Sequence, residues 1–233
     1  MENREDTATQ QTLIKSIVAG SIGVFVHWFD WAIYAYLSAT IAQVFFPEQS
    51  GASGLMAVFG VLALSFAVRP IGALLFGHFG DKFGRTKTLT IVILAMSAGT
   101  LMVGIIPGFE SIGIWAPILL VIARVVQGLA AGGEYGSAAA FMAEYSPAKY
   151  RGFGVSWIEV GALLGFLVAA VVVYIISVSM SDEDLFNWGW RLPFILSAPL
   201  GVIGFYIRSH IKDTPEFQTL EKMNNVASSP IKD

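Results

Sequence analysis

Six ionisable side chains lie inside long apolar stretches of the sequence: His27, Asp30, Arg69, Arg124, Glu134 and Glu159. A charge is costly in hydrocarbon, so we expect each of these side chains to face protein or a water-filled cavity. Desolvation and a neighbouring arginine have opposite effects on the proton affinity of a carboxylate. A carboxylate that moves relative to Arg124 can therefore take up and release a proton. Asp30 and Glu134 are the first candidates for this role, and His27 and Glu159 are the next.

The remainder of the chain has the composition of a membrane protein. Hydrophobic residues make up 55% of the 233 residues and charged residues only 13%, with a mean hydropathy of +0.66. Most of such a chain cannot be the surface of a soluble domain. A net charge of −3, without a long basic stripe, does not indicate nucleic acid binding. The chain has no cysteine, and we find no metal-ligand cluster, phosphate loop or nucleophile motif, so we expect no metal, no cofactor and no enzymatic activity.

The apolar runs predict an all-α membrane protein with six transmembrane helices, at residues 17–46, 55–76, 88–107, 112–145, 152–179 and about 188–207. The first run would be about 45 Å long as a helix, which exceeds a bilayer core, so it must tilt or bend. Pro70 should kink the second helix. The third holds no ionisable group, which suits a helix that faces lipid.

The distribution of positive charge predicts the orientation of these helices. Lys82, Arg85 and Lys87 lie within six positions of one another, and bases near the end of a span resist translocation. Of the fourteen Lys and Arg residues, eleven fall on the proposed inner side, one outside and two within spans. We therefore expect a multi-pass protein of the plasma membrane with both termini in the cytoplasm. The expected parts are a cytoplasmic tail (residues 1–14), a six-helix bundle (15–208) and the start of a central cytoplasmic loop (209–233).

Helical spacing places several of these residues on common faces. One face of the first helix is small at one end and polar in the middle: Gly20, Gly23, His27, Asp30, Trp31 and Tyr34. One face of the fourth carries Arg124, Gln127, Gly128, Ala131 and Tyr135. Two sets of glycines recur every four residues, a spacing that lets helices approach closely: Gly128, Gly132 and Gly136, and Gly161 and Gly165. Glu159 should lie at about the depth of Asp30.

The pairing of the buried charges remains open from the sequence. Arg69 is either a cation in a cavity or the partner of Asp30. Arg124 can pair with Asp30 or with Glu134, and a charge that changes partners suits a proton relay. His27 is either a hydrogen-bonded packing residue or a member of that relay.

Several motifs resemble those of major facilitator superfamily transporters, over about residues 16–218. The segment GHFGDKFGRTK is similar to the superfamily's loop between helices 2 and 3 at Gly77, Asp81, Lys82, Gly84, Arg85 and Lys87. Residues 124–128, RVVQG, resemble its helix 4 motif, which is linked there to proton coupling. Residues 23–34 and 132–135 look like its metabolite:proton symporters, and residues 113–120 and 132–147 look most like proline and glycine betaine transporters. Val24, His27 and Thr86 depart from the usual Asn, Glu and base.

The resemblance implies the six-helix N-terminal half of the superfamily fold. Such proteins consist of two halves around a midplane site, so the expected partner is a missing C-terminal half, with a second copy of the chain as the alternative. We expect a truncated product, whose intramembrane charges line the face that meets the other half. The implied function is proton-coupled symport of a small organic solute, either an osmolyte such as proline or betaine or an organic acid. The alternative is a six-helix pore or scaffold subunit without proton coupling.

The resemblance also implies two groups of site residues. The expected cytoplasmic gate is a charge network with its glycines, formed by Gly77, Asp81, Lys82, Gly84, Arg85, Glu144 and Arg151. The expected solute-binding residues are Trp28, Trp31, Tyr34, Arg69, Gln127 and Tyr135. Aromatic rings can meet a quaternary ammonium group, and Arg124 can meet a carboxylate.

Overall fold

The computed structural model describes the backbone of residues 2–49 and 51–210, and the side chains of Ile14, residues 17–49 and residues 51–210. The expected loop at 209–233 therefore lies almost wholly outside the described residues. Within them every regular element is helical. Six helices are long and apolar enough to cross a membrane, which confirms the expected fold class.

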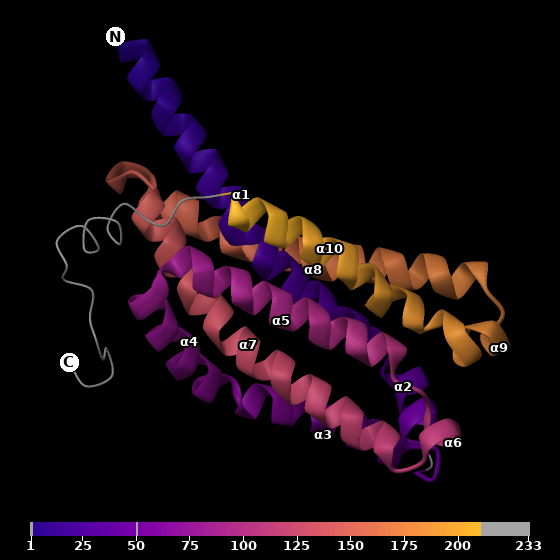
Figure 1. Cartoon of the computed structure of the whole chain (residues 1–233). Coiled ribbons are helices and arrows are strands. Elements are labelled where there is room, and N and C mark those ends of the chain that lie inside the picture. Colours follow the sequence, from indigo (N-terminus) through magenta and orange to yellow (C-terminus); the bar gives the residue numbers. More distant parts are fainter. Residues whose placement is uncertain (1, 50, 211–233) are drawn as a thin grey trace.

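The six spans are α1 (Glu2–Tyr36), α3 with α4 (Ala52–Ala67 and Arg69–Phe83), α5 (Arg85–Ile105), α7 (Trp115–Tyr145), α8 (Arg151–Ser179) and α10 (Arg191–Ser209). They lie side by side as a bundle (Figure 1). Short elements form the connections: α2 (Ser38–Phe45), α6 (Phe109–Ile112), a 3-10 turn (Ala148–Tyr150), α9 (Asp182–Asp184) and a π-helix (Leu185–Gly189). The chain is a multi-pass membrane protein.

Two of the spans are interrupted where the sequence predicts a bend or a kink. The first apolar run breaks at Leu37, between α1 and α2. The second breaks at Val68, and α4 then begins with Arg69 and Pro70. Proline has no backbone N–H and clashes with the carbonyl four residues before it, but it is well tolerated in the first turn of a helix. Pro70 therefore ends one helix and begins the next.

The expected eleven-residue loop at 77–87 is almost entirely helical, which corrects the sequence prediction. Helix α4 continues to Phe83 and α5 begins at Arg85, so only Gly84 lies between them. Gly84 has φ +100°, a conformation that side-chain-bearing residues rarely adopt. A single glycine therefore reverses the chain here, and the charges of the motif lie on helix ends.

Close glycine contacts join α8 to α1. A Cβ on Gly161 would lie 2.8 Å from the backbone oxygen of Ser21, and one on Gly165 would lie 2.6 Å from that of Phe25. Both distances are shorter than real Cβ contacts allow. The two helices run in the same direction with Gly161 beside Ser21, which fixes their relative register.

A second set of glycines joins α7 to the broken span. Added Cβ atoms on Gly128 and Gly132 would collide with the backbone oxygens of Ser65 and Arg69, respectively. This confirms the predicted close approach at two of the three positions. Gly136 instead faces open space, with nothing within 4 Å of an added Cβ. The close approach of the two backbones therefore includes Gly128 and Gly132 but not Gly136.

Helix α5 is not the lipid-facing helix that the lack of ionisable residues in the run 88–107 suggested. Eleven of its residues are buried, Thr100 among them, and it packs against α10 and α7. At the C-terminal end of α5, Arg191 donates hydrogen bonds to the carbonyls of Gly104 and Ile106, at 2.8 and 2.7 Å. The part of α5 beyond Lys87 has no charged residue, yet it lies in the middle of the bundle, where Thr100 donates a hydrogen bond to Asp30 on α1.

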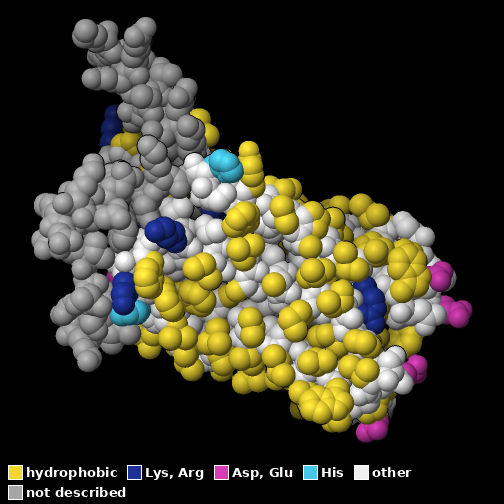
Figure 2. Space-filling model, in the orientation of Figure 1, with side chains coloured by type: hydrophobic (Ala, Val, Ile, Leu, Met, Phe, Trp, Pro, Cys, Tyr) yellow, Lys and Arg dark blue, Asp and Glu magenta, His cyan; other side chains and the backbone are white. Residues whose placement is uncertain are grey.

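The two ends of the bundle differ in charge. We call the end with the α4–α5 and α7–α8 connections the basic end, because it carries Lys82, Arg85, Lys87, Lys149 and Arg151. The opposite, acidic end carries Glu48, Glu110, Asp182, Glu183 and Asp184. In Figure 2 hydrophobic side chains cover most of the face between the two ends.

The spans differ in how far they are buried. In the most apolar part of the α3–α4 span and of α8, 22% of the residues are buried, against 72% for α1 and 56% for α7. The exposed side chains on these two spans are mostly large and apolar, for example Phe59, Leu74, Leu163 and Tyr174. Lipid or another apolar surface can cover them.

Candidate functional site

A buried ion pair between Asp30 and Arg124 lies in the centre of the bundle. Arg124 Nη1 lies 2.7 Å from Asp30 Oδ2, and both side chains are only 1% exposed. The other carboxylate oxygen accepts hydrogen bonds from Thr100 Oγ1 at 2.8 Å and from Gln127 Nε2 at 3.1 Å. Helices α1, α5 and α7 thus meet at one carboxylate. The sequence allowed Arg124 to pair with Asp30 or with Glu134, and in the structure it pairs with Asp30.

The ring of Tyr34 packs against the same arginine. The guanidinium carbon lies 3.8 Å from the ring centroid, and the Tyr34 hydroxyl donates to the carbonyl of Val58 at 3.2 Å. Tyr34 is fully buried, so it supports Arg124 and offers no free ring face to a solute. Arg124 keeps two nitrogens, Nε and Nη2, that are buried without a hydrogen-bond partner.

A second buried ion pair joins Glu134 to a residue that the sequence analysis had placed at the cytoplasmic boundary. Arg208, near the end of α10, donates to both carboxylate oxygens of Glu134, at 2.6 and 3.2 Å. It also donates to the backbone oxygens of Ala19 on α1 and Leu89 on α5. One guanidinium therefore ties four helices together near the basic end.

Arg208 is the main residue that sequence reasoning missed. It follows an apolar run directly, so it was counted as one of the inner bases. Its position relative to α7 depends on how the helices pack, which no local pattern reveals. A weak signal exists in Gly23, because an added Cβ there would collide with both Arg208 and Glu134. A small residue at this point of α1 marks the space that the pair fills.

The first two ion pairs leave Arg69 without a carboxylate partner among the described residues. Its Nη2 lies 3.0 Å from His27 Nε2, and its guanidinium carbon lies 4.3 and 4.1 Å from the ring centroids of Trp31 and Phe66. The alternative in which Arg69 pairs with Asp30 is therefore wrong. Trp31 is buried against this cluster and has no free face for a solute.

Arg69 and His27 border a small cavity between α1, α4 and α7. Its volume is about 220 Å³, and its lining residues are Val24, His27, Trp28, Arg69, Ala131, Glu134 and Tyr135. The cavity thus brings together Arg69 and four other residues expected to bind the solute or couple protons: His27, Trp28, Glu134 and Tyr135. Asp30, Trp31, Tyr34, Arg124 and Gln127 do not line it.

Glu159 lies apart from the central ion pair. It is exposed on α8, and its carboxylate accepts a hydrogen bond from the hydroxyl of Tyr135. Because Gly161 lies beside Ser21, Glu159 is level with Ala19, about eleven positions, or roughly 16 Å, closer to the basic end than Asp30. The expectation of equal depth is wrong, because α8 begins at Arg151, nearer to the basic end than the start of the apolar run of α1.

The residues of the expected gate form only part of a network. Asp81 and Arg85 make a salt bridge of 2.8 Å across the Gly84 turn. No ion pair joins Glu144 or Arg151 to them within the described part of the chain, and Arg151 is exposed. Gly84 provides the turn itself. Gly77 has open space beside it, and Lys82 is exposed.

Comparison with known proteins places this arrangement in a family. Residues 15–232 match the model of the family described as sugar (and other) transporter. The chain belongs to the sugar (and other) transporter family. It is 44% identical over 206 residues to the proline/betaine transporter of Escherichia coli strain K12, which is 88% of this chain and 41% of that protein. It is also 44% identical over 212 residues to the glycine betaine/proline/ectoine/pipecolic acid transporter of Dickeya dadantii, covering 91% and 42% of the two chains.

The fold agrees with that of a solved member of the same superfamily. The structure of the major facilitator superfamily proton:xylose symporter bound to 6-bromo-6-deoxy-D-glucose matches 93% of this chain and 48% of the other, with a TM-score of 0.82 and 19% identity. The fold is therefore the six-helix half of a major facilitator superfamily protein. The chain spans about two fifths of the length of the curated relatives that it matches.

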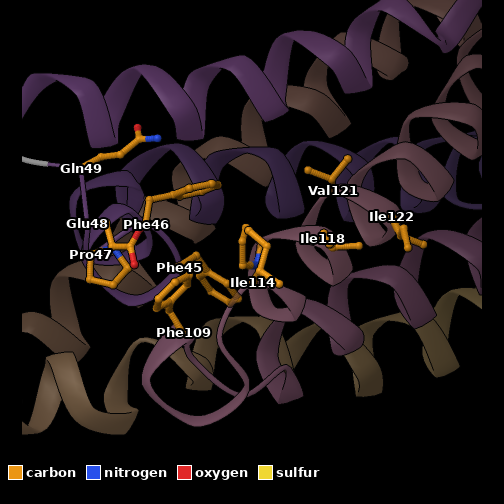
Figure 3. Close-up of a pocket in the computed structure, with 11 residues that line it drawn as sticks. Phe45, Phe46, Pro47, Glu48, Gln49, Phe109, Ile114, Ile118, Val121 and Ile122 are labelled. Atoms are coloured by element: carbon orange, nitrogen blue, oxygen red, sulfur yellow. The ribbon is translucent and has the colours of Figure 1, made fainter.

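This sugar (and other) transporter family member has a second, larger hollow at the acidic end. The hollow has a volume of about 390 Å³ and lies between the α2–α3 connection and the beginning of α7 (Figure 3). Phe45, Phe109, Ile114, Ile118 and Ile122 make its walls apolar, and Glu48 lies at one side. None of the expected site residues lines it. In the described part of the chain no group of three His, Asp or Glu side chains can hold a metal ion.

Proposed function

We propose that the chain is the N-terminal half of a proton-coupled symporter for a small organic solute of the proline and glycine betaine type. The observation that carries this proposal is the pair Asp30–Arg124, buried in the middle of a superfamily bundle a short way from the Arg69 cavity. The printed functions of the two relatives support the solute class. The fold supports alternating access, in which one half moves against the other around a central site.

The proposed coupling depends on the charge of Asp30. In its ionised form the carboxylate holds Arg124, Thr100 and Gln127 together, and so joins three helices. Protonation removes that charge and leaves a buried guanidinium unpaired, which is costly. The helices are then expected to rearrange until Arg124 finds another acceptor. Proton binding thereby becomes linked to a change in packing.

Glu134 is the second proton-coupling candidate. It borders the cavity and is paired with Arg208 on its other side. Trp28, Arg69 and Tyr135 remain the proposed solute-binding residues, because they line the same cavity. Asp81 and Arg85 remain the proposed gate. His27, which stands in place of the Glu that is usual in the metabolite:proton symporters, is treated separately below.

The proposed orientation places the basic end in the cytoplasm, because bases near span ends resist translocation. Both termini then lie inside the cell, as tail 1–14 and loop 209–233 flanking the bundle 15–208. The proposed location is the plasma membrane. The proposed partners are the solute, protons, the lipid bilayer and a second six-helix half.

The test of this function is solute accumulation. The chain would be co-expressed with the C-terminal half of the E. coli proline/betaine transporter, and uptake of labelled proline and betaine measured in vesicles under an imposed inward proton gradient. The proposal expects accumulation above equilibrium that a protonophore abolishes. Flux that merely equilibrates the solute, independent of the gradient, would instead favour the pore.

A further inference from the structure

Two arginines of the described spans, Arg124 and Arg208, are almost fully buried, and both are neutralised. Arg124 is paired with Asp30 and Arg208 with Glu134, in each case within 2.7 Å. Arg69, half-buried within the α3–α4 span, has no carboxylate partner among the described residues, and its polar contact is with a histidine. A cation in a low-dielectric surrounding is stable only with a partner or with water. Arg69 lines a cavity, so the missing partner can come from there.

Three polar atoms on residues that line the cavity lack hydrogen-bond partners. They are Arg69 Nε, His27 Nδ1 and Trp28 Nε1. Arg69 can only donate, so His27 Nε2 accepts the hydrogen bond between them, and the proton of a neutral His27 lies on Nδ1. All three unpartnered groups are therefore N–H donors. Buried donors without partners are rare, and three of them on residues that line one cavity point to an acceptor bound there.

Rigid packing holds these donors in place. His27 is only 3% exposed, and its ring stacks with Trp31, with 6.1 Å between centroids. The ring of Trp28 contacts that of Phe166 on α8, at 5.1 Å between centroids. The contacts of Arg69 with Trp31 and Phe66 orient its guanidinium. A preorganised set of donors binds an anion with little loss of side-chain freedom.

We propose that Arg69, His27 and Trp28 form the carboxylate-binding subsite of the cavity, on the basis of the solute-binding function proposed above. A carboxylate has two oxygens that accept several hydrogen bonds, and a planar guanidinium matches its geometry. The ammonium end of the solute then lies toward Tyr135, whose hydroxyl is bound to the carboxylate of Glu159. The site therefore takes a small zwitterion, with opposite charges at its two ends.

This arrangement argues against the expectation that Arg124 binds the carboxylate of the solute. Arg124 is held by Asp30, Gln127 lies beside that pair, and neither lines the cavity. It also gives His27 a role as a solute ligand, distinct from both proton relay and simple packing. The cavity of about 220 Å³ is smaller than the roughly 300–1,000 Å³ typical of sites for drug-sized molecules, which restricts the solute to a few heavy atoms.

The test measures binding to the purified 233-residue chain in lipid nanodiscs by isothermal titration calorimetry. Three probes separate the two ends of the solute: glycine betaine, choline, which lacks the carboxylate, and 3,3-dimethylbutyrate, which keeps the carboxylate and lacks the positive charge. We expect wild type to bind betaine at least ten times more tightly than choline, and to retain binding of 3,3-dimethylbutyrate. Arg69→Gln should weaken betaine binding by roughly 10- to 100-fold, the effect of losing hydrogen bonds to a charged group.

Further variants keep the result interpretable. Arg69→Lys keeps the charge without the planar fork and should fall between wild type and Arg69→Gln. His27→Phe should weaken betaine binding several-fold and leave choline unaffected. Lys149→Gln, on an exposed turn outside the cavity, should bind betaine as wild type does. The comparison of betaine with choline on the wild-type chain needs no variant, so it stands even if Arg69→Gln fails to fold.

The proposal is overturned if choline binds as tightly as betaine, if Arg69→Gln binds betaine with wild-type affinity, or if neither carboxylate probe binds the wild-type chain. These outcomes are distinct from a failure of the symport proposal. Arg69-dependent betaine binding without gradient-driven accumulation would remove proton coupling and leave the subsite. Gradient-driven accumulation that does not depend on Arg69 would support proton coupling and remove the subsite.

Discussion

Arg208 Nη2 lies 2.6 Å from Glu134 Oε1, and this ion pair joins the end of α10 to the middle of α7. Both side chains are 2% exposed. The guanidinium also binds carbonyls of Ala19 and Leu89, so its donors are used on three neighbouring helices. Such a residue fixes the mutual positions of the helices at the basic end more firmly than apolar packing alone.

The pair predicts that removing one charge destabilises the protein more than removing both. Arg208→Met should lower the free energy of unfolding by about 3–5 kcal/mol, because it leaves the buried charge of Glu134 uncompensated. Combining it with Glu134→Leu should restore at least half of that loss, since both charges are then gone. Thermal unfolding in detergent, followed by circular dichroism, measures both. Arg151→Gln, at an exposed position, serves as the matched control and should change stability by less than about 0.5 kcal/mol.

A double variant that is less stable than Arg208→Met would contradict this account. It would mean that, without Arg208, replacing Glu134 by leucine costs more than removing its buried charge gains.

The glycines of α7 predict a contrast within a single helix. Gly132→Leu should destabilise the bundle by at least about 2 kcal/mol, because its side chain would meet the backbone of Arg69 and Ala73. Gly136→Leu, one turn further on, has open space and should be neutral or stabilising by up to about 1 kcal/mol, since leucine favours helix more than glycine does. The same melting experiment compares them. Equal effects at the two positions would show that helix propensity alone decides.

The sequence alone predicted those features that depend on residues close together in the chain. Apolar length gave the six spans, and Pro70 marked the break at Val68. Spacing every four residues identified Gly128 and Gly132 as contact points, but it could not show that Gly136 faces open space. That distinction depends on how α7 packs against its neighbours, which the local sequence does not specify.

Tertiary packing decided the features that the sequence left open or gave wrongly. Asp30 had two candidate arginines, and only the packing of α1 against α7 selects Arg124. Thr100 lies in an apolar run without charged residues, so nothing in its surroundings indicated that it would bind Asp30. The intramembrane charges were expected to face the missing half, whereas Asp30 is buried inside this one.

The central pair predicts separate effects on coupling and on solute binding. Asp30→Asn should abolish gradient-driven accumulation while leaving betaine binding within about threefold of wild type, because Asp30 does not line the cavity. Vesicle uptake in the co-expression system measures the first, and calorimetry on the chain the second. Lys87→Gln, exposed at the basic end, is the control for both measurements. If Asp30→Asn still concentrates the solute under an imposed gradient, Asp30 is structural.

The Asp81–Arg85 bridge predicts an effect on transport without an effect on folding. The bridge spans the Gly84 turn, where the α4–α5 connection is held at the surface of the basic end. Asp81→Asn should lower the uptake rate in the co-expression system by roughly tenfold, while membrane insertion stays at the wild-type level. Uptake is normalised to the amount of chain in the membrane, determined by quantitative immunoblotting. Wild-type uptake by the correctly inserted variant would exclude Asp81 from the gate.

The 233-residue chain alone is expected to insert into a membrane but not to accumulate solute. Insertion is favourable because each helix satisfies its own backbone, and because the pairs Asp30–Arg124 and Glu134–Arg208 are neutralised inside the bundle. Accumulation needs a second half, since alternating access moves one half against the other. Liposomes containing the chain alone at matched density should therefore show no proton uptake on addition of betaine, whereas the co-expressed halves should.

The alternative partner makes the opposite prediction. In a pair of chains, each copy could cover the α3–α4 and α8 spans of the other. Only 22% of the residues in the most apolar part of these spans are buried, so most of their side chains are partly or fully exposed. Saturable, gradient-driven betaine uptake by the purified chain would then occur without any second half. It should depend on the square of the protein density at low density, because it requires two copies. That result would replace the two-half assembly with a functional homodimer.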